Sequence, residues 1–335
     1  MHDEPKHRSL RIVYAGSGPF GINCLDAVLE SSHEIRLIIT APPRPAGRGR
    51  KSRPTGVRRW AEAHNVPVVE TADINSPGMI SEIRGLAPDV LVVVAFASKI
   101  SGELTAVPAL AAVNVHASLL PKYRGAAPIN WAIIKGESRT GVTVITLAER
   151  MDAGRILGIA ETEIGEDETA GELHDRLAAM AGPLLVDVLD RIASGRVVYA
   201  EQDHSRATLA PRLNKVDGYI DFGESARQVR NRIRGLWPWP GASAVYVSKA
   251  GDRRQPVTIA GAGVVDKPVD TSLPAGTLDE DLCIACGRGA LKIDMLKPSG
   301  RRLMDFASFA NGWRCRPGDM FLSKGVVAGG AGDHV

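Results

Sequence analysis

An asparagine and a histidine stand two positions apart, at Asn114 and His116, where an apolar run ends. Alternate side chains of a β-strand point to the same face, so this spacing puts a carboxamide beside an imidazole as the chain leaves a sheet. Open α/β sheets bind small molecules beyond the carboxyl ends of their strands. We therefore expect Asn114 and His116 to form half of an active site, to which the rest of the chain brings a substrate.

Two more residues bear on this site. Asp152 stands in a turn after another strand-like run, residues 142–146, and would place a carboxylate at the mouth of a neighbouring strand. Ser118 is a conceivable nucleophile, but neither a strained nucleophile turn nor an evident third partner accompanies it. A single histidine at a strand end is more often structural than catalytic. The coincidence of Asn114, the Ser-Leu-Leu-Pro turn after His116 and Asp152 favours a catalytic histidine.

The segments that would position these residues alternate between strand-like and helix-like patterns. Strands are expected at residues 10–15, 34–40, 66–69, 90–95, 111–116 and 142–146, with helices between most of them. The run from Val90 to Ala95 is continuously apolar, as in a strand that is buried on both faces of a parallel sheet. This alternation predicts an α/β fold with a Rossmann-like, open, mostly parallel sheet.

A glycine-rich turn after the first strand offers an alternative function. Gly16-Ser17-Gly18-Pro19-Phe20-Gly21 matches the dinucleotide-binding fingerprint between a strand and a helix. No acidic residue ends the second strand to hold a ribose. Arg44 could instead favour a 2′-phosphate, so an NADP oxidoreductase stays open as an alternative. We favour the simpler interpretation, a tight glycine turn that any doubly wound sheet needs here.

The pattern changes after about residue 205. Short strand-like runs at residues 243–247, 256–264, 282–285 and 291–296 are separated by turns that carry glycine and proline. Such spacing predicts a small β-barrel, similar to an OB-fold. We expect a first domain at residues 1–203, a linker at 204–212, a smaller barrel-like domain at 213–322 and a disordered tail at 323–335.

Composition limits the classes of protein that need to be considered. The chain is 44% hydrophobic and 24% charged, and these are ordinary values for a globular protein. No apolar run reaches the roughly 18 residues of a membrane helix, and the polar N-terminus lacks the apolar core of a signal peptide. Four cysteines do not make a disulfide framework. Cys283 and Cys286 form a lone C-x-x-C without a second ligand pair, so we expect core cysteines rather than a metal site, and a cytoplasmic protein.

Basic residues are concentrated rather than numerous, because the net charge is only +3. An acid-free stretch contains Arg44, Arg48, Arg50, Lys51, Arg53, Arg58 and Arg59. Such a stretch favours a binding site for a polyanion over a solvated face. A second concentration consists of Arg227, Arg230, Arg232 and Arg234. Trp237 and Trp239, each followed by proline, could stack on bases, although a structural role is favoured.

The central motifs resemble those of the formyltransferase family that uses 10-formyltetrahydrofolate. The family pattern is Asn-x-His on a strand, then Ser-Leu-Leu-Pro, then an aspartate in a later loop, and this chain has all three parts. The basic stretch Arg44–Lys51 resembles the loop with which the methionyl-tRNA formyltransferases hold the acceptor arm of tRNA. Segments 124–129, 140–143, 219–222 and 239–242 resemble that subfamily too, and the resemblance covers residues 10 to 321.

This resemblance implies roles for individual residues. It implies that Asn114, His116 and Asp152 are catalytic. It implies that the folate is bound by Phe96, Ala97, Ser118, Leu119, Leu120 and Pro121, and the tRNA by Arg44, Arg48, Arg50 and Lys51. The chain departs from the family at Phe96-Ala97, where Tyr-Gly is usual, and at Pro43, where an acid usually precedes Arg-Pro. Residues 1–203 would then be the catalytic domain and residues 213–322 a tRNA-binding domain.

The implied reaction is transfer of a formyl group to the amine of initiator methionyl-tRNA. Its tetrahedral intermediate carries an oxyanion, which Asn114 and His116 could stabilise by donating hydrogen bonds. Asp152, hydrogen-bonded to His116, would favour the protonated imidazole and could accept the proton of the attacking amine. We expect a folate co-substrate, no metal, no membrane partner and a monomer. A sugar-nucleotide formyltransferase and an inert RNA-binding protein on the same scaffold stay open as alternatives.

Overall fold

The computed structural model describes residues 8–46, 51–265 and 273–323, which form two compact units. The described residues of Met1–Pro128, Arg139–Glu163 and His174–Pro211 make up the first unit. The second contains Ile129–Ser138, Ile164–Leu173 and the described residues from Arg212 onward. Of the disordered tail expected at residues 323–335, Ser323 is the last residue of a strand, and residues 324–335 lie outside the described residues.

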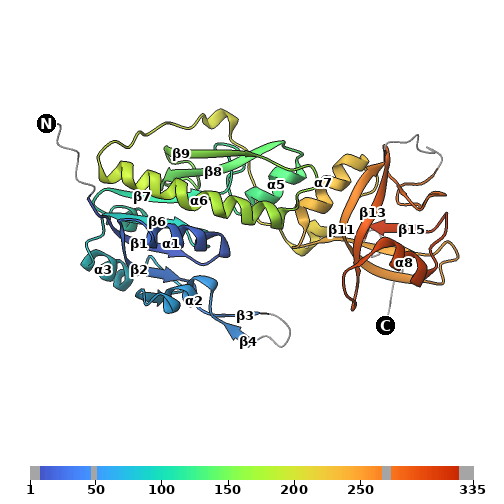
Figure 1. Ribbon diagram of the computed structural model, residues 1–335, viewed down its shortest axis with the longest axis horizontal. Helices are drawn as coiled ribbons and strands as arrows, with labels where there is room; N and C mark the ends of the chain where they lie inside the picture. The colour runs from blue at the N-terminus through green and yellow to red at the C-terminus, as the bar shows by residue number, and fades with distance from the viewer. Residues whose placement is uncertain (1–7, 47–50, 266–272, 324–335) are drawn as a thin grey trace. The chain divides into compact units, whose positions relative to one another are not determined.

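The first unit is built on a seven-stranded sheet with the order β5-β2-β1-β6-β7-β8-β9 (Figure 1). The strands are β1 Arg11–Gly16, β2 Glu34–Thr40, β5 Val68–Glu70, β6 Val90–Val94, β7 Ala111–His116, β8 Arg139–Thr146 and β9 Ile156–Glu163. Neighbours from β5 to β7 pair in parallel, whereas β8 and β9 pair antiparallel. All five residues of β6 are buried, as the continuous apolar run predicted.

Helices α1 Ile22–Leu29, α2 Gly56–Ala63, α3 Pro77–Gly85, α4 Gly102–Thr105, α5 Pro128–Ile134 and α6 Ala170–Ala193 occupy the connections of this half of the chain. A short 3-10 turn, Pro19–Gly21, precedes α1. Helices α1 and α6 pack closely, because a Cβ at Gly182 would lie only 2.6 Å from the carbonyl oxygen of Asn23 (Figure 1). Strands alternating with helices confirm the predicted α/β class with a mostly parallel sheet.

The second unit is built on an antiparallel sheet with the order β12-β13-β11-β10-β15, and β14 pairs with β13. Its strands are β10 Ala242–Val247, β11 Arg254–Val265, β12 Ile284–Ala285, β13 Ala290–Pro298, β14 Met304–Asp305 and β15 Met320–Ser323. Thr277 bridges to Met320 and Leu278 bridges to Ile284, so one short segment links the two edge strands. The sheet is therefore nearly closed, which confirms the predicted barrel-like architecture.

An aromatic cluster fills the core of this barrel. Tyr246 from β10 contacts Phe309 of α8 (Phe306–Trp313) and Phe321 of β15 at centroid distances of 5.5 and 5.6 Å. The Tyr246 hydroxyl donates to the buried carboxylate of Asp319 at 2.6 Å. Helix α7, Ala226–Leu236, begins at Ser225 with a capping box and packs on β11. In the part of the chain that the structure describes, no helix is both long and apolar enough to span a membrane.

Candidate active site

Asn114 and His116 end β7, in the middle of the first unit's sheet. Asn114 is opposite Val93 of β6 and Ile145 of β8, and His116 is opposite Thr143 of β8. The two residues are two positions apart in one regular strand, so their side chains share a face, as the spacing predicted. His116 is buried, while Asn114 is half-buried. Within the described residues, no hydrogen bond engages the Asn114 carboxamide, so its N–H groups can serve a substrate.

Backbone geometry decides which ring nitrogen of His116 carries a hydrogen. Nε2 lies 2.9 Å from the carbonyl oxygen of Tyr123. A carbonyl only accepts, so Nε2 is the donor in this bond. Nδ1 consequently faces the carboxylate of Asp152, with 3.6 Å between Nδ1 and Oδ2. That separation is longer than the hydrogen bond expected from the sequence, but it lies within ion-pair range.

Asp152 lies in a tight turn that local contacts support. Its backbone adopts a left-handed conformation with φ 53°, which a residue other than glycine rarely takes. Its Oδ2 accepts a hydrogen bond from the N–H of Gly125 at 2.8 Å. Gly154 permits the tight turn, because a Cβ there would lie 1.7 Å from the carbonyl oxygen of Thr146. The structure therefore brings Asn114, His116 and Asp152 to one place, at the carboxyl end of β7.

Ser118 belongs to the scaffold of the following turn. It is fully buried, and its Oγ donates to the carbonyl oxygen of Lys122 at 2.7 Å. Thr143 donates to the Ser118 carbonyl oxygen at 2.6 Å and accepts from the Leu120 N–H at 3.3 Å. A serine held in this way is not an exposed nucleophile, in agreement with the sequence. Thr143 was missed by sequence reasoning, because nothing in an apolar strand signals that its hydroxyl binds a turn.

The remaining predicted folate residues lie on two loops of the first unit. Leu119 is half-buried against Gly141 of β8, Leu120 is buried, and the Leu120–Pro121 peptide bond is cis. Phe96 follows β6 and packs against the apolar core, while Ala97 beside it is exposed. These residues follow the carboxyl ends of adjacent strands, β6 and β7, which is where an open sheet accepts a ligand.

The glycine-rich turn serves packing against Tyr14. A Cβ at Gly21 would lie 2.1 Å from the Tyr14 hydroxyl oxygen, and a Cβ at Gly16 would lie 2.6 Å from its ring. That hydroxyl donates to the Gly21 carbonyl oxygen at 2.9 Å, and burial raises the pKa of Tyr14 well above its usual value. The Gly18 N–H is bound to the Ala95 carbonyl oxygen. The glycines therefore accommodate a buried tyrosine, which supports the structural interpretation of this motif.

The basic stretch, which resembles a loop in its sequence, contains two short strands that pair as a hairpin. Strands β3 Arg44–Ala46 and β4 Lys51–Arg53 pair antiparallel, with Arg44 opposite Arg53 (Figure 1). Arg48 and Arg50 lie outside the described residues. Both ends of the stretch are tied together, because Thr40 and Thr55 share a hydrogen bond of 2.9 Å. Two arginines at its end are already engaged by the fold. Arg58 pairs with Glu62 at 2.6 Å, and Arg59 donates to the Pro54 carbonyl oxygen.

The second arginine concentration is largely structural. Arg230 pairs with Asp167 and Glu166, and Arg232 donates to the carbonyl oxygens of Asp217 and Tyr219. Arg234 donates to the carbonyl oxygens of Gly165 and Glu168, and burial lowers the pKa of its guanidinium. Three of the four arginines therefore bind other segments of their own unit. The basic character of this helix does not indicate a polyanion site.

Two further sequence features have ordinary surroundings. Cys283 and Cys286 are both buried and neither forms a disulfide, and burial raises the pKa of Cys286 to about 12. They are core cysteines, as predicted. Among the described residues, no group of three or more potential metal ligands is gathered. Trp237 is half-buried, whereas Trp239 is 56% exposed between prolines.

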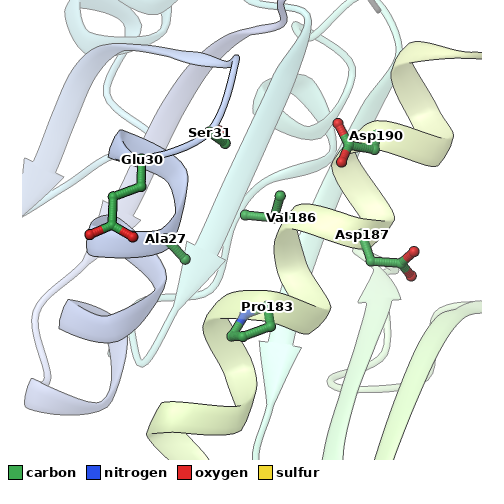
Figure 2. Close-up of a pocket in the computed structure, with 7 residues that line it drawn as sticks. All are labelled: Ala27, Glu30, Ser31, Pro183, Val186, Asp187 and Asp190. Carbon is green, nitrogen blue, oxygen red and sulfur yellow. The ribbon is translucent and has the colours of Figure 1, made fainter.

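A hollow lies between α1 and α6 (Figure 2), and none of the residues predicted to be functional lines it. It is lined by Ala27, Glu30, Ser31, Pro183, Val186, Asp187 and Asp190. Three of these side chains are acidic, and Figure 2 shows the carboxylates around a small apolar floor. An acidic rim repels anionic ligands. The hollow therefore does not compete with the basic stretch as a site for a polyanion.

Comparison with known proteins identifies the family. Residues 10–189 match formyl transferase, and residues 212–314 match the formyl transferase C-terminal domain. The chain belongs to the formyltransferase family. The methionyl-tRNA formyltransferase of Citrifermentans bemidjiense is 37% identical over 320 residues, covering 96% of this chain and 99% of that protein. The methionyl-tRNA formyltransferase of Solibacter usitatus is 38% identical over 305 residues, covering 91% and 96%. These matches confirm the resemblance carried by the sequence motifs.

Solved structures share the fold of this formyltransferase at low identity. WlaRD, a sugar 3N-formyl transferase, superposes with a TM-score of 0.62 at 17% identity, covering 88% of this chain and all of that chain. HypX from Aquifex aeolicus, in complex with tetrahydrofolic acid, superposes with a TM-score of 0.60 at 15% identity, covering 91% of this chain and 48% of that chain. At these identities the comparison shows the fold alone.

Proposed function

We propose that this formyltransferase moves the formyl group of 10-formyltetrahydrofolate to the free amino group of initiator methionyl-tRNA. The observation that carries the proposal is the convergence of Asn114, His116 and Asp152 at the carboxyl end of β7. A carboxamide, an imidazole and a carboxylate are sufficient for acyl transfer to an amine. Relatives named methionyl-tRNA formyltransferase, aligned over nearly the whole chain, support the acceptor.

The reaction requires three roles, which these residues can fill. The amine nitrogen attacks the formyl carbon, and the carbonyl oxygen becomes an oxyanion. Donors aimed at that oxygen stabilise it. In our proposal Asn114 donates through its carboxamide, and His116 donates through Nδ1–H of its protonated ring, because its Nε2–H is bound to the Tyr123 carbonyl oxygen. Asp152 takes the proton that the attacking nitrogen sheds. When the intermediate collapses, the bond from the formyl carbon to the folate nitrogen breaks, and that nitrogen receives the proton that Asp152 took from the amine. The charge balances without a metal or a covalent enzyme intermediate.

The folate and the tRNA would use different parts of the first unit. We assign the folate to the loops after β6 and β7, through Phe96, Ala97, Leu119 and Pro121, while the buried Ser118 and Leu120 shape the second of these loops. Phe96 offers an aromatic ring and Leu119 an apolar surface to a pteridine. We assign the tRNA backbone to the basic hairpin, through Arg44, Arg48, Arg50 and Lys51. Phosphate contacts of this kind position a nucleic acid without reading its sequence.

Transfer of labelled formate to charged initiator tRNA tests this proposal directly. We expect turnover with methionyl-tRNA and none with an amino-sugar nucleotide, which is the acceptor of the alternative function. His116→Ala should lose at least 100-fold in kcat while tRNA binding is retained. His64→Ala, at an exposed histidine after α2, is the matched control and should behave as wild type. Absence of transfer to tRNA by the wild-type protein would overturn the proposed acceptor. Full turnover by the His116 variant would overturn the proposed site.

A further inference from the structure

A buried arginine lies directly behind the candidate active site. Arg124 precedes Gly125, whose N–H binds the Asp152 carboxylate, and Arg124 is only 6% exposed. Its Nη2 donates to Oε1 of Gln202 at 2.6 Å and to Nδ1 of His204 at 2.8 Å. Both acceptors come from a segment almost 80 residues away in sequence. Among the described residues, no hydrogen bond or ion pair joins these three side chains to the side chains of Asn114, His116 or Asp152.

Gln202 also binds the turn that carries Asp152. Its Nε2 donates to the carbonyl oxygen of Asp152 at 2.8 Å and to the carbonyl oxygen of Gly154 at 2.7 Å. Arg124 can only donate, so it fixes the amide oxygen of Gln202 toward itself and the amide nitrogen toward the turn. Glutamate has the same shape as glutamine but has no N–H for the two carbonyl oxygens.

The same segment also holds the other side of the site. The Tyr123 N–H donates to Oγ1 of Thr208 at 2.9 Å, and the Arg124 N–H donates to the Thr208 carbonyl oxygen at 2.9 Å. The Ala210 N–H donates back to the Arg124 carbonyl oxygen at 2.7 Å. Tyr123 in turn provides the carbonyl oxygen that binds His116. Residues 202–210, most of which were expected to form a linker, therefore contact the supports of both His116 and Asp152.

The burial of Arg124 does not indicate a net contribution to the stability of the fold. Its Nε is buried and has no hydrogen-bond partner within the described residues. A buried, incompletely paired charge costs stability, and an apolar side chain of similar size would be cheaper. The turn that it supports places Asp152 at a positive φ, a conformation that persists only when its surroundings enforce it.

We propose that Arg124 and Gln202 are positioning residues, which hold the Asp152 turn so that its carboxylate faces His116. The inference rests on the proposed function for its readout, because the effect is on formyl transfer. Arg124 fixes Gln202, Gln202 fixes the turn, and the turn fixes the carboxylate. A shift of about 1 Å in a catalytic group can cost up to about 100-fold in rate, so this chain of contacts acts on kcat.

The test is a double-mutant cycle between Gln202→Glu and Asp152→Asn on the full chain. We expect Gln202→Glu to lower kcat about tenfold with unchanged KM for both substrates, and Asp152→Asn to lower it about 100-fold. The double variant should be no slower than Asp152→Asn alone, since there is no carboxylate left to position. Gln255→Glu, at a half-buried glutamine of β11, is the matched control and should leave kcat unchanged. Multiplicative losses, or an unchanged kcat in Gln202→Glu, would overturn the inference.

A second variant covers the possibility that Gln202→Glu does not fold, which circular dichroism would show. Arg124→Lys keeps the charge but cannot bind Gln202 and His204 through one planar group. It should also lower kcat without raising KM, and its effect should also vanish in the Asp152→Asn background. Losses that multiply in this cycle overturn the inference as well. If the wild-type protein formylates only an amino-sugar nucleotide, the proposed tRNA acceptor is refuted. Both mutant cycles would then be measured with the amino-sugar nucleotide as acceptor, so the positioning role is tested separately.

Discussion

Oδ2 of Asp152 lies 3.6 Å from Nδ1 of His116, and it does so because Gly125 holds the same oxygen through its backbone N–H. The carboxylate is thereby shared between the ring and the peptide group. Replacement by asparagine keeps an oxygen for the Gly125 N–H but removes the charge. The structural support and the chemical role of Asp152 can therefore be separated by one substitution.

We expect Asp152→Asn to fold normally and to lose about 100-fold in kcat, since the proton acceptor is gone. KM for tRNA should stay within twofold, because no phosphate contact is altered. Steady-state formylation and thermal unfolding of the same preparation would measure both effects. Asp175→Asn, at an aspartate whose side chain is 86% exposed on α6, controls for the loss of a carboxylate. A variant that keeps full turnover would remove Asp152 from the mechanism.

The basic hairpin should contribute affinity that salt weakens. Arg44→Ala and Lys51→Ala should each raise KM for tRNA several-fold and leave kcat unchanged. Each phosphate contact that is lost should reduce the slope of log K against log salt concentration by about 0.9. Binding measured at several salt concentrations checks this. Arg36→Ala, in β2 outside the hairpin and paired with Glu34, is the control. Unchanged slopes in both hairpin variants would assign the tRNA to another surface.

Local patterns predicted much of this structure because they report burial. The apolar run at residues 90–95 identified a strand that is buried on both faces, and the Asn-x-His spacing identified two side chains on one face. Strand direction is a different matter. The antiparallel pairing of β8 with β7 depends on how the intervening chain returns, and no local pattern in residues 142–146 encodes it.

Distant partners account for what the sequence could not reveal. Arg230 and Arg234 look like a basic helix face, yet their acceptors lie more than 60 residues earlier. Gln202 lies 50 residues after Asp152, just before the expected linker at residues 204–212, and nothing in the sequence there indicated its contact with the Asp152 turn. The glycine-rich turn matched a dinucleotide fingerprint because its glycines are needed, but the group that requires them is the Tyr14 side chain. Residue type and spacing indicate that a position is constrained, but they do not identify the residue that it contacts.

Acid should weaken the first unit through Asp89. Its carboxylate is 1% exposed and binds the Arg11 N–H at 2.9 Å, Arg11 Nε at 3.1 Å and Arg8 Nη2 at 2.7 Å. Burial alone would raise the pKa of Asp89, but these hydrogen bonds and charges together lower it below its ordinary value. A lowered pKa in the folded state adds stability above the unfolded value of about 3.9. That stability disappears as the pH falls through the folded value.

Asp89→Asn should therefore cost about 2 kcal/mol in free energy of unfolding at pH 7 and almost nothing near pH 2. Both partner arginines are partly exposed, which keeps the loss below that of a fully buried pair. Urea unfolding at the two pH values measures it. Asp73→Asn, at an exposed aspartate before α3, should show no such pH dependence. Equal losses for Asp89→Asn at both pH values would mean that shape rather than charge is responsible.

Gly21 and Tyr14 should be energetically coupled. A Cβ at position 21 would lie 2.1 Å from the Tyr14 hydroxyl oxygen, but 3.4 Å from the ring carbon that bears it. Gly21→Ala should therefore cost about 2 kcal/mol in free energy of unfolding through overpacking. Tyr14→Phe should cost about 1 kcal/mol, because the hydrogen bond to the Gly21 carbonyl oxygen is lost.

Without the hydroxyl, the added methyl group has ordinary van der Waals room. The double variant should then be more stable than the sum of the single losses predicts, by about 1 kcal/mol or more. KM for the folate should be unchanged throughout, since the glycines accommodate the tyrosine rather than a ligand. Gly78→Ala, on α3 with open space at its Cβ position, is the control substitution. Additive losses at positions 14 and 21 would contradict the coupling between Gly21 and Tyr14. A folate KM that rises with Gly21→Ala would indicate that the glycine-rich turn binds a ligand.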